Sequence, residues 1–412
     1  MRHFNSIVIG AGNAGLCAAA ALQRGGSSTL LLERHNIPGG CATSFVRGEF
    51  EFEVALHQLS GLGTEDKPSI MRDVFGRLGV MDRVEFVEEH ALYRMVVPGE
   101  FDIALPADWT QLKHTLQDTF PSESDAIQRF LDLCEMIAFE ANVALHGGLK
   151  SNNEEFFRAR CPHFVKYGFK SVKEVLDEYF QDPKLKSALA VYWTYAGVPP
   201  SIMRFSDLAS MLYAYAEFKP WHIKGGSQAM STALMESFHE AGGEVHFNCG
   251  AEKIITKGGR VSGVRLETGE VVSCDAVVSN ASPIATFHDL LDFEQPPLNI
   301  QEDFKSRRMG TSAFAIYLGL NCTPQALGIT QASTFVQNTL NEDLIHGSMD
   351  SMDAIHSALL TCYNLEDSDF APLGKSNVTL LCLQYGDKWK DVPPEQYAQA
   401  KYECAEKLIV LM

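Results

Sequence analysis

The 412-residue sequence lacks the cysteine and histidine patterns of disulfide frameworks and zinc sites. Its ten cysteines lie far apart with no Cys-x-x-Cys motif, and its histidines form no His-x-x-x-His motif. A chain of this length can bury a large core, so it does not need disulfides for stability. We therefore expect a reduced, intracellular protein without a metal site.

Long apolar runs and positive charge are also scarce. No uninterrupted apolar stretch reaches the roughly 18 residues of a membrane-spanning helix, and glycines break the first apolar run, unlike in a signal peptide. The 34 Lys and Arg residues stand against 52 Asp and Glu residues, and the net charge of −18 repels nucleic acid. We expect a cytoplasmic protein with no nucleic-acid partner.

Several catalytic motifs are missing as well. The sequence has no Gly-x-Ser-x-Gly elbow, no P-loop lysine motif and no second Gly-x-Gly-x-x-Gly loop. Their absence disfavours hydrolases, kinases and reductases that bind two dinucleotides.

The N-terminus carries the pattern of a βαβ unit. A β-rich run at 6–9 precedes a glycine loop, an alanine-rich helical stretch ends at Gly25-Gly26, and a second apolar strand covers Thr29–Leu32. This order predicts an α/β fold with a parallel sheet.

The loop Gly10-Ala11-Gly12-Asn13-Ala14-Gly15 fits the dinucleotide-binding pattern. Gly10 permits the tight turn, Gly12 lets the backbone approach a pyrophosphate, and Gly15 permits close packing of helix on strand. The start of the following helix offers unpaired N–H groups and a partial positive charge to phosphates.

Glu33 lies directly after the second strand, where a carboxylate can accept hydrogen bonds from ribose hydroxyls. That carboxylate would repel a 2′-phosphate, so NADP is disfavoured, while NAD and FAD both remain compatible. The alternative is an ordinary solvated charge at a strand end.

A second glycine pair follows in the segment 34–43 and could let the backbone run beside an extended cofactor. The alternative is an ordinary Pro-Gly turn. The candidate cofactor contacts in this segment are Arg34, Gly39, Gly40, Cys41, Ala42 and Thr43.

The rest of the chain alternates between two sequence patterns, amphipathic helical stretches and short strands with glycine turns. Long amphipathic stretches such as 127–143 predict a largely helical insertion between about Gly61 and Pro220. The strand and glycine pattern of the N-terminal segment then resumes. It comprises a glycine-led helix from Lys224, three short strands between 253 and 273 and a further buried strand at 275–280. We predict a first domain at 1–62 and 223–292, interleaved with a second at 63–222 and 293–412.

These motifs together resemble the phytoene desaturase, carotenoid isomerase and retinol saturase family. The match is carried by residues 7–33, the Pro38-Gly39-Gly40 turn and the stretch 50–57, with further agreement at 224–230, 241–245 and 277–283. The resemblance implies a Rossmann-type FAD-binding domain, glutathione-reductase-like with a β-meander, interleaved with a mixed, largely helical substrate domain. It covers nearly the whole chain.

The resemblance also implies site roles. It assigns the FAD pyrophosphate to Gly10–Gly15, the adenosine ribose to Glu33 and adenine-side backbone contacts to Ala251, and it places His57 near the flavin ring. It implies an oxidoreductase for CH–CH donors that desaturates, saturates or isomerises a hydrophobic polyene through hydride exchange at flavin N5.

Two other functions stay open from the sequence: a flavin amine oxidase, and a lipid carrier without catalysis like the Rab-escort and GDP-dissociation-inhibitor proteins. The aromatic stretches 193–200 and 211–215 predict either a substrate tunnel or core. A lipid substrate would have to be drawn from a bilayer, so we predict peripheral membrane docking through the helical domain. The sequence leaves the oligomeric state open.

The last five residues, Leu408–Met412, are apolar and no cap or polar tail follows them. The family pattern continues with a further flavin-binding segment. We therefore expect the chain to be truncated at its C-terminus.

Overall fold

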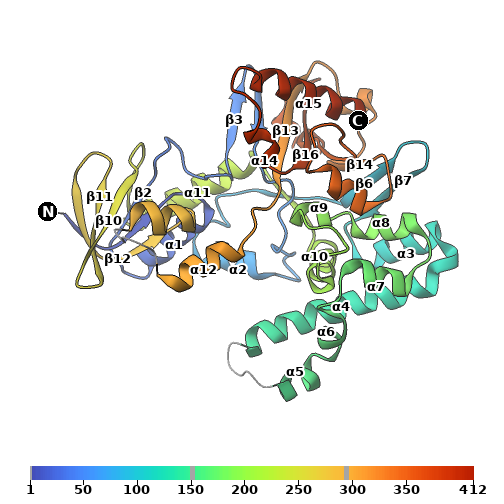
Figure 1. The fold of residues 1–412 in the computed structure, drawn as a ribbon, viewed down its shortest axis with the longest axis horizontal. Helices are drawn as coiled ribbons and strands as arrows, with labels where there is room; N and C mark the ends of the chain where they lie inside the picture. Colours follow the sequence, from blue (N-terminus) through green and yellow to red (C-terminus); the bar gives the residue numbers. More distant parts are fainter. Residues whose placement is uncertain (1, 149–153, 292–296) are drawn as a thin grey trace. The chain divides into compact units, whose positions relative to one another are not determined.

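The computed structural model describes residues 2–148, 154–291 and 297–412, and the chain divides into two compact units (Figure 1). Each unit is built from three separate segments. Unit 1 comprises Met1–His57, Ile70–Val87 and Ile223–Met309, and unit 2 comprises Gln58–Ser69, Glu88–His222 and Gly310–Met412. The predicted domain boundary at 292 and 293 lies outside the described residues, and the assignment of cofactor and substrate roles to the units stays a prediction.

Unit 1 contains the predicted βαβ arrangement. Strand β1 (His3–Ile9) leads into helix α1 (Asn13–Arg24), and strand β2 (Thr29–Leu32) pairs with β1 in parallel. All four residues of β2 and the last four of β1 are buried, as the apolar runs predict. The Gly25-Gly26 pair ends α1, with both N–H groups bonded to carbonyls of its last turn.

The sheet of unit 1 has the order β10-β11-β12-β1-β2-β9. Its meander strands are β10 (Ala251–Lys257), β11 (Arg260–Leu266) and β12 (Val271–Ser279), and β9 covers Glu244–His246. The sequence predicted separate strands at 271–273 and 275–280, but β12 is one strand because no turn residue interrupts it. Its first half pairs antiparallel with β11 and its length pairs parallel with β1.

The prediction of a buried strand at 275–280 is wrong in its burial. Asp275 and Ala276 are exposed and Val278 is 37% exposed, so the fully buried residues of β12 lie in its first half, while half-buried Val277 packs against the same core. That core joins Ile7, Leu30 and Val264 across the sheet.

Helix α11 (Gly226–Glu240) packs on α1 in unit 1. The glycine-led start and the Gly242-Gly243 end agree with the predicted helix. The unit also contains the hairpin β3 (Ser44–Arg47) and β4 (Phe50–Glu53), helix α2 (Ile70–Arg77), a π-helix at Ala285–Leu290 and helix α12 (Leu298–Ser306). Strands β5 (Phe86–Glu88) and β8 (Trp221–Ile223) lie where the chain passes between the units.

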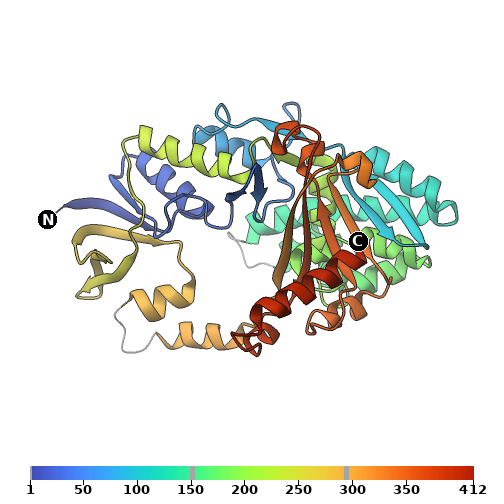
Figure 2. The same ribbon diagram turned by 90° about the horizontal axis from the view of Figure 1, so that it is seen from above.

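Unit 2 is a mixed fold around a six-stranded sheet that the sequence interpretation missed. Its order is β13-β16-β15-β14-β6-β7, and only the β14 and β6 pair is parallel. The strands are β6 (Ala91–Val97), β7 (Phe101–Pro106), β13 (Ser312–Leu320), β14 (Ser333–Gln337), β15 (Ser357–Thr361) and β16 (Ser376–Gln384). Helix α15 (Tyr397–Leu411) packs on β15 and β16 (Figure 2).

The helical part of unit 2 matches the predicted amphipathic stretches. The longest helix, α4 (Ser124–Gly148), packs against α10 (Phe205–Phe218). The other helices are α3 (Trp109–Thr119), α5 (Glu154–Arg160), α6 (Pro162–Tyr167), α7 (Val172–Tyr179), α8 (Pro183–Ala190), α9 (Trp193–Ala196), α13 (Glu342–Ser348) and α14 (Asp387–Lys390). A Ser171–Glu174 capping box starts α7, and the Asp182 side chain caps α8.

Candidate functional site

The glycine loop between β1 and α1 disfavours a side chain at Gly10 and Gly15 and crowds one at Gly12. Gly10 has a φ of +95°, and a Cβ on Gly15 would lie 2.0 Å from the Gly10 carbonyl oxygen. A Cβ on Gly12 would lie 2.8 Å from Nδ2 of Asn280, the residue that follows β12. The loop is therefore shaped by the absence of side chains, which is what close approach of a phosphate requires.

Helix α1 begins without a side-chain cap. Gly12 is the N-cap residue, in an extended conformation, and no side chain caps the helix. The first intrahelical bond runs from the Leu16 N–H to the Gly12 carbonyl. The N–H groups of Asn13, Ala14 and Gly15 lie before that bond, in the helix turn that attracts anions.

Glu33 lies against this loop, as the spacing predicts. Its Oε2 accepts a hydrogen bond from the Ala11 N–H (2.6 Å), and its Oε1 accepts one from the His35 N–H (2.8 Å). A carboxylate has about four acceptor positions, so lone pairs remain for ribose hydroxyls. The Arg34 side chain is 73% exposed and pairs with Glu267 (2.9 Å), and its contact with a cofactor stays a prediction.

The start of β10 runs beside the segment that follows β2. The Cys249 N–H donates to the Glu33 carbonyl (2.9 Å) and the Asn248 N–H donates to the His35 carbonyl (3.0 Å). Ala251, the first residue of β10, is buried two residues further on. The structure thus brings Ala251 to the same region as Glu33, while its contact with adenine stays a prediction.

The second glycine segment folds back onto the first loop. The Gly39 N–H donates to the Ala11 carbonyl (2.8 Å), and a Cβ on Gly40 would lie 3.2 Å from the Gly12 Cα. Both glycines have positive φ, +122° and +64°. The structure therefore unites the two glycine segments, with exposed Cys41 following directly in the chain.

Helix α11 holds the second segment from the other side. Ser231 Oγ donates to the Ala42 carbonyl (2.7 Å), Gln228 Nε2 donates to the Pro38 carbonyl (3.2 Å), and Thr43 Oγ1 donates to Gln228 Oε1. These side chains fix the backbone on which a cofactor would rest. The sequence interpretation predicted this helix but gave its polar side chains no part in the site; their signal is polar residues in the first two turns of a glycine-led helix.

Glu53 is a further supporting residue that sequence reasoning missed. Its side chain is 2% exposed, yet its carboxylate accepts hydrogen bonds from the Ser227 N–H (2.7 Å) and the Ser227 hydroxyl (2.6 Å). The N–H groups of Ala55 and Leu56 donate to the same carboxylate at 3.3 and 3.2 Å. Glu53 thus caps α11 and ties the β3–β4 hairpin to it.

His57 ends the first segment of unit 1, four residues after β4. Burial lowers the pKa of His57 to about 4, because the charged imidazolium loses its hydration. The imidazole is therefore neutral at physiological pH. Its position beside a flavin ring stays a prediction.

The aromatic stretches proposed for a tunnel lie mainly in the core of unit 2. Trp193 is fully buried, and Tyr192 packs with Tyr195 and Tyr215 at centroid distances of 5.1 and 5.0 Å. Tyr195 and Tyr215 are only half-buried. The core alternative therefore holds for Trp193 and Tyr192.

A buried carboxyl group lies beside this aromatic cluster. Glu89 Oε2 accepts a hydrogen bond from Gln58 Nε2 (2.7 Å), and the hydroxyl groups of Tyr192 and Tyr195 reach Gln58 Oε1 at 3.4 and 3.5 Å. Burial raises the pKa of Glu89 to about 8. Unit 2 thus holds a neutral carboxyl group in its core at pH 7.

Neither a metal cluster nor a membrane-spanning helix occurs in the described ranges. No three His, Cys, Asp or Glu side chains gather as metal ligands would in the part of the chain that the structure describes. No helix within residues 2–148, 154–291 and 297–412 is both long and apolar enough to cross a bilayer.

Comparison with known families gives one match across almost the whole chain. The model described as "flavin containing amine oxidoreductase" matches residues 13–408. A solved structure of an oxidoreductase from Methanosarcina mazei superposes with a TM-score of 0.66 at 18% identity, covering 98% of this chain and 84% of that one. This likeness confirms the predicted fold class.

Curated relatives match at low identity. Phytoene desaturase (lycopene-forming) of Pantoea ananas is 28% identical over 76% of this chain and 63% of its own. Chloroplastic prolycopene isomerase of Daucus carota is 22% identical over 99% and 66%, and all-trans-retinol 13,14-reductase of Danio rerio is 24% identical over 94% and 67%. The chain spans about two thirds of the length of these relatives.

Proposed function

The chain belongs to the family of flavin-containing amine oxidoreductases, and on this premise we propose that it acts on carbon–carbon bonds of a hydrophobic polyene. Flavin is the cofactor of this family, in agreement with the predicted FAD. The loop Gly10–Gly15 and the segment 39–43 together form a cradle of two glycine segments beside Glu33. This cradle carries the proposal, in a chain whose relatives are named for carotenoid and retinoid reactions. The substrate class is a carotenoid or retinoid-like lipid.

The pyrophosphate and adenosine parts of FAD would each have a place in this cradle. The pyrophosphate would lie at Gly10–Gly15 against the uncapped start of α1, where a side chain on Gly12 or Gly15 would collide with the protein itself. Glu33 would accept the hydroxyl groups of the adenosine ribose. Backbone of 39–43 and Ala251 would flank the extended cofactor.

A bound flavin supplies hydride exchange at N5, so the protein has little covalent chemistry to perform. Its own side chains would orient the polyene, exclude water and hold the cofactor backbone. His57, neutral at pH 7, would add no charge to an apolar substrate site. Desaturation, saturation and cis–trans isomerisation are all compatible with a flavin that exchanges hydride and a protein that binds and orients the substrate.

The direct test starts with reconstitution of the purified chain with FAD and with NAD. We expect a flavin absorbance band that persists through gel filtration, and no retention of NAD. Anaerobic mixing of the oxidised and reduced forms with phytoene, prolycopene and all-trans-retinol, followed by chromatography of the products, then identifies the reaction. Retention of NAD in place of FAD would overturn the proposal.

Amine oxidation is a second candidate, because the family description names amine oxidoreductases. The two functions differ in their electron donors. Oxygen consumption that responds to aliphatic amines and not to polyenes would favour the amine oxidase.

A further inference from the structure

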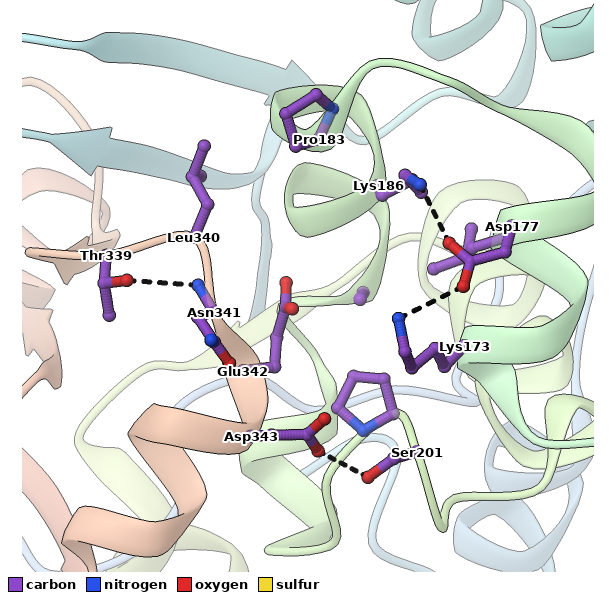
Figure 3. A pocket seen from close by; sticks show the side chains of 13 residues that line it. Lys173, Asp177, Pro183, Lys186, Ser201, Thr339, Leu340, Asn341, Glu342 and Asp343 are labelled. Carbon is purple, nitrogen blue, oxygen red and sulfur yellow. Dashed lines mark hydrogen bonds and ion pairs between the residues drawn. The ribbon is translucent and has the colours of Figure 1, made fainter.

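Unit 2 contains a pocket of about 540 Å³ that the proposed chemistry does not use (Figure 3). Two of its walls are helices α7 and α8. The remaining walls are the Pro200-Ser201 turn and residues 339–343 at the start of α13. This volume lies in the range of pockets that bind small molecules.

One side of the pocket carries an excess of positive charge. Lys173 Nζ lies 3.1 Å from Asp177 Oδ2, and Lys186 Nζ lies 2.8 Å from Asp177 Oδ1. Two ammonium groups thus share one carboxylate, as Figure 3 shows, which leaves a net charge of +1. A singly charged anion such as a phosphodiester would balance it.

The segment at the start of α13 supplies negative charge to the same pocket. Asp343 Oδ1 accepts a hydrogen bond from Ser201 Oγ (2.6 Å), and the Glu342 side chain points into the space between the walls (Figure 3). Burial raises the pKa of Glu342, and the hydroxyl of buried Ser187 offsets part of that rise. A cationic group bound here would pair with both carboxylates.

An exposed aliphatic residue follows a lining residue in each of two segments of the pocket wall. Ile202, next to Ser201, is 66% exposed, and Leu344, next to Asp343, is 49% exposed. The Ser201–Asp343 hydrogen bond joins the two segments that carry them. Exposed aliphatic residues of this kind could enter the boundary between headgroups and acyl chains of a bilayer, where burial of apolar surface is favourable.

We propose that this pocket binds the phosphate–ammonium headgroup of a zwitterionic phospholipid. The phosphate would lie at Lys173 and Lys186 and the ammonium at Glu342 and Asp343. Ile202 and Leu344 would enter the boundary with the acyl chains.

The net charge of −18 favours this lipid class, because it repels anionic bilayers as a whole. The site would hold the enzyme at the bilayer in which a polyene dissolves, and in this respect it rests on the proposed function. Its charge pattern and exposed aliphatic side chains stand independently of the flavin.

The test is flotation of the full chain with phosphatidylcholine vesicles, alongside calorimetry with free phosphocholine. We expect vesicle binding by the wild type that free phosphocholine inhibits. We expect Lys173→Met and the double variant Ile202→Ser/Leu344→Ser each to weaken vesicle binding at least tenfold. The matched controls are Lys388→Ala and Leu373→Ser, which change an exposed lysine and a fully exposed leucine away from the pocket.

Circular dichroism establishes that each variant is folded. Vesicle binding that survives both pocket variants, or no vesicle binding by the wild type, overturns the proposal. Calorimetric binding of free phosphocholine without vesicle binding indicates a soluble zwitterion and also overturns the lipid assignment.

Turnover of a detergent-solubilised polyene separates this proposal from the proposed function. Pocket variants that lose vesicle binding but keep turnover in detergent support the headgroup site. A wild type that binds vesicles through the pocket but turns over no polyene refutes the proposed function and leaves the headgroup site intact.

Discussion

Replacement of Glu53 by Gln should destabilise unit 1 strongly, although the two side chains have nearly the same size and shape. The Glu53 carboxylate accepts four hydrogen bonds, two of them from Ser227 at 2.6 and 2.7 Å. The residue is buried, with only 2% of its surface exposed. In Gln, one oxygen becomes an amide NH₂ that faces a donor. If the amide oxygen keeps the position of Oε1, its NH₂ group confronts the Ser227 N–H.

The expected loss has two parts. A charge-assisted hydrogen bond contributes about 1.5–3 kcal/mol, and a carboxylate at a helix start contributes about 0.3–1 kcal/mol. We therefore expect Glu53→Gln to lower the free energy of unfolding of unit 1 by about 2–4 kcal/mol. The matched control Glu252→Gln, at an exposed position of β10, should change it by less than about 0.5 kcal/mol.

The assay has to distinguish the two units. Hydrogen exchange of peptides from α11 and β1 in a urea series reports unit 1. Tryptophan fluorescence reports unit 2, because all four tryptophans lie in its segments: Trp109, Trp193, Trp221 and Trp389. A loss below about 1 kcal/mol in unit 1 would refute the role of Glu53 as the cap of α11.

Three further predictions follow from the same structure. Gly15→Ala should abolish retention of FAD in gel filtration, since its Cβ would lie 2.0 Å from the Gly10 oxygen, whereas Gly76→Ala, with open space around it, should retain the cofactor. Unit 2 should lose stability as the pH rises from about 4.5 to about 8, because unfolded Glu89 ionises at its ordinary pKa while folded Glu89 stays protonated. Urea unfolding followed by tryptophan fluorescence at several pH values measures this dependence, and Glu89→Gln should make it flatter. The ring resonances of His57 should not titrate between about pH 5 and pH 8, and a midpoint near the ordinary value would contradict its burial.

Local signals predicted the N-terminal half of the cradle well. The ends of β2 agree with the predicted strand, and α1 ends at the predicted glycine pair, because apolar runs and glycines act within a few residues. The spacing also placed Glu33 beside the loop. The cofactor contacts of these residues stay predictions.

Long-range partners could not be predicted in the same way. Glu53 and Ser227 are 174 residues apart, and nothing near Glu53 in the sequence indicates a helix start that needs a cap. Asn280 lies beside Gly12 from still farther along the chain. Pairing between distant segments depends on the tertiary fold, which a residue pattern records only indirectly.

The sheet of unit 2 was missed for a different reason. All five residues of β14 are buried, as are the first five of β16, so these strands lack the alternation that marks a half-exposed strand. Both strands also contain buried polar residues, such as Ser333, Gln337 and Asn377, so neither is a continuous apolar run either. The amphipathic stretch 127–143, which lies within α4, was predicted.

The pairing of β1 with β12 has a consequence for biosynthesis. In this register His3 lies opposite Ser273, 270 residues later in the chain. At roughly 5–20 residues per second, a ribosome needs about 15–55 s to deliver the second strand after the first. For that interval the nascent chain carries the apolar edge at Ile7–Ile9 without its neighbour, while much of unit 2 has already been synthesised. If the proposed cofactor site holds, the segment that carries Asn280 must leave the ribosome before the site is complete, so capture of the flavin would follow its synthesis.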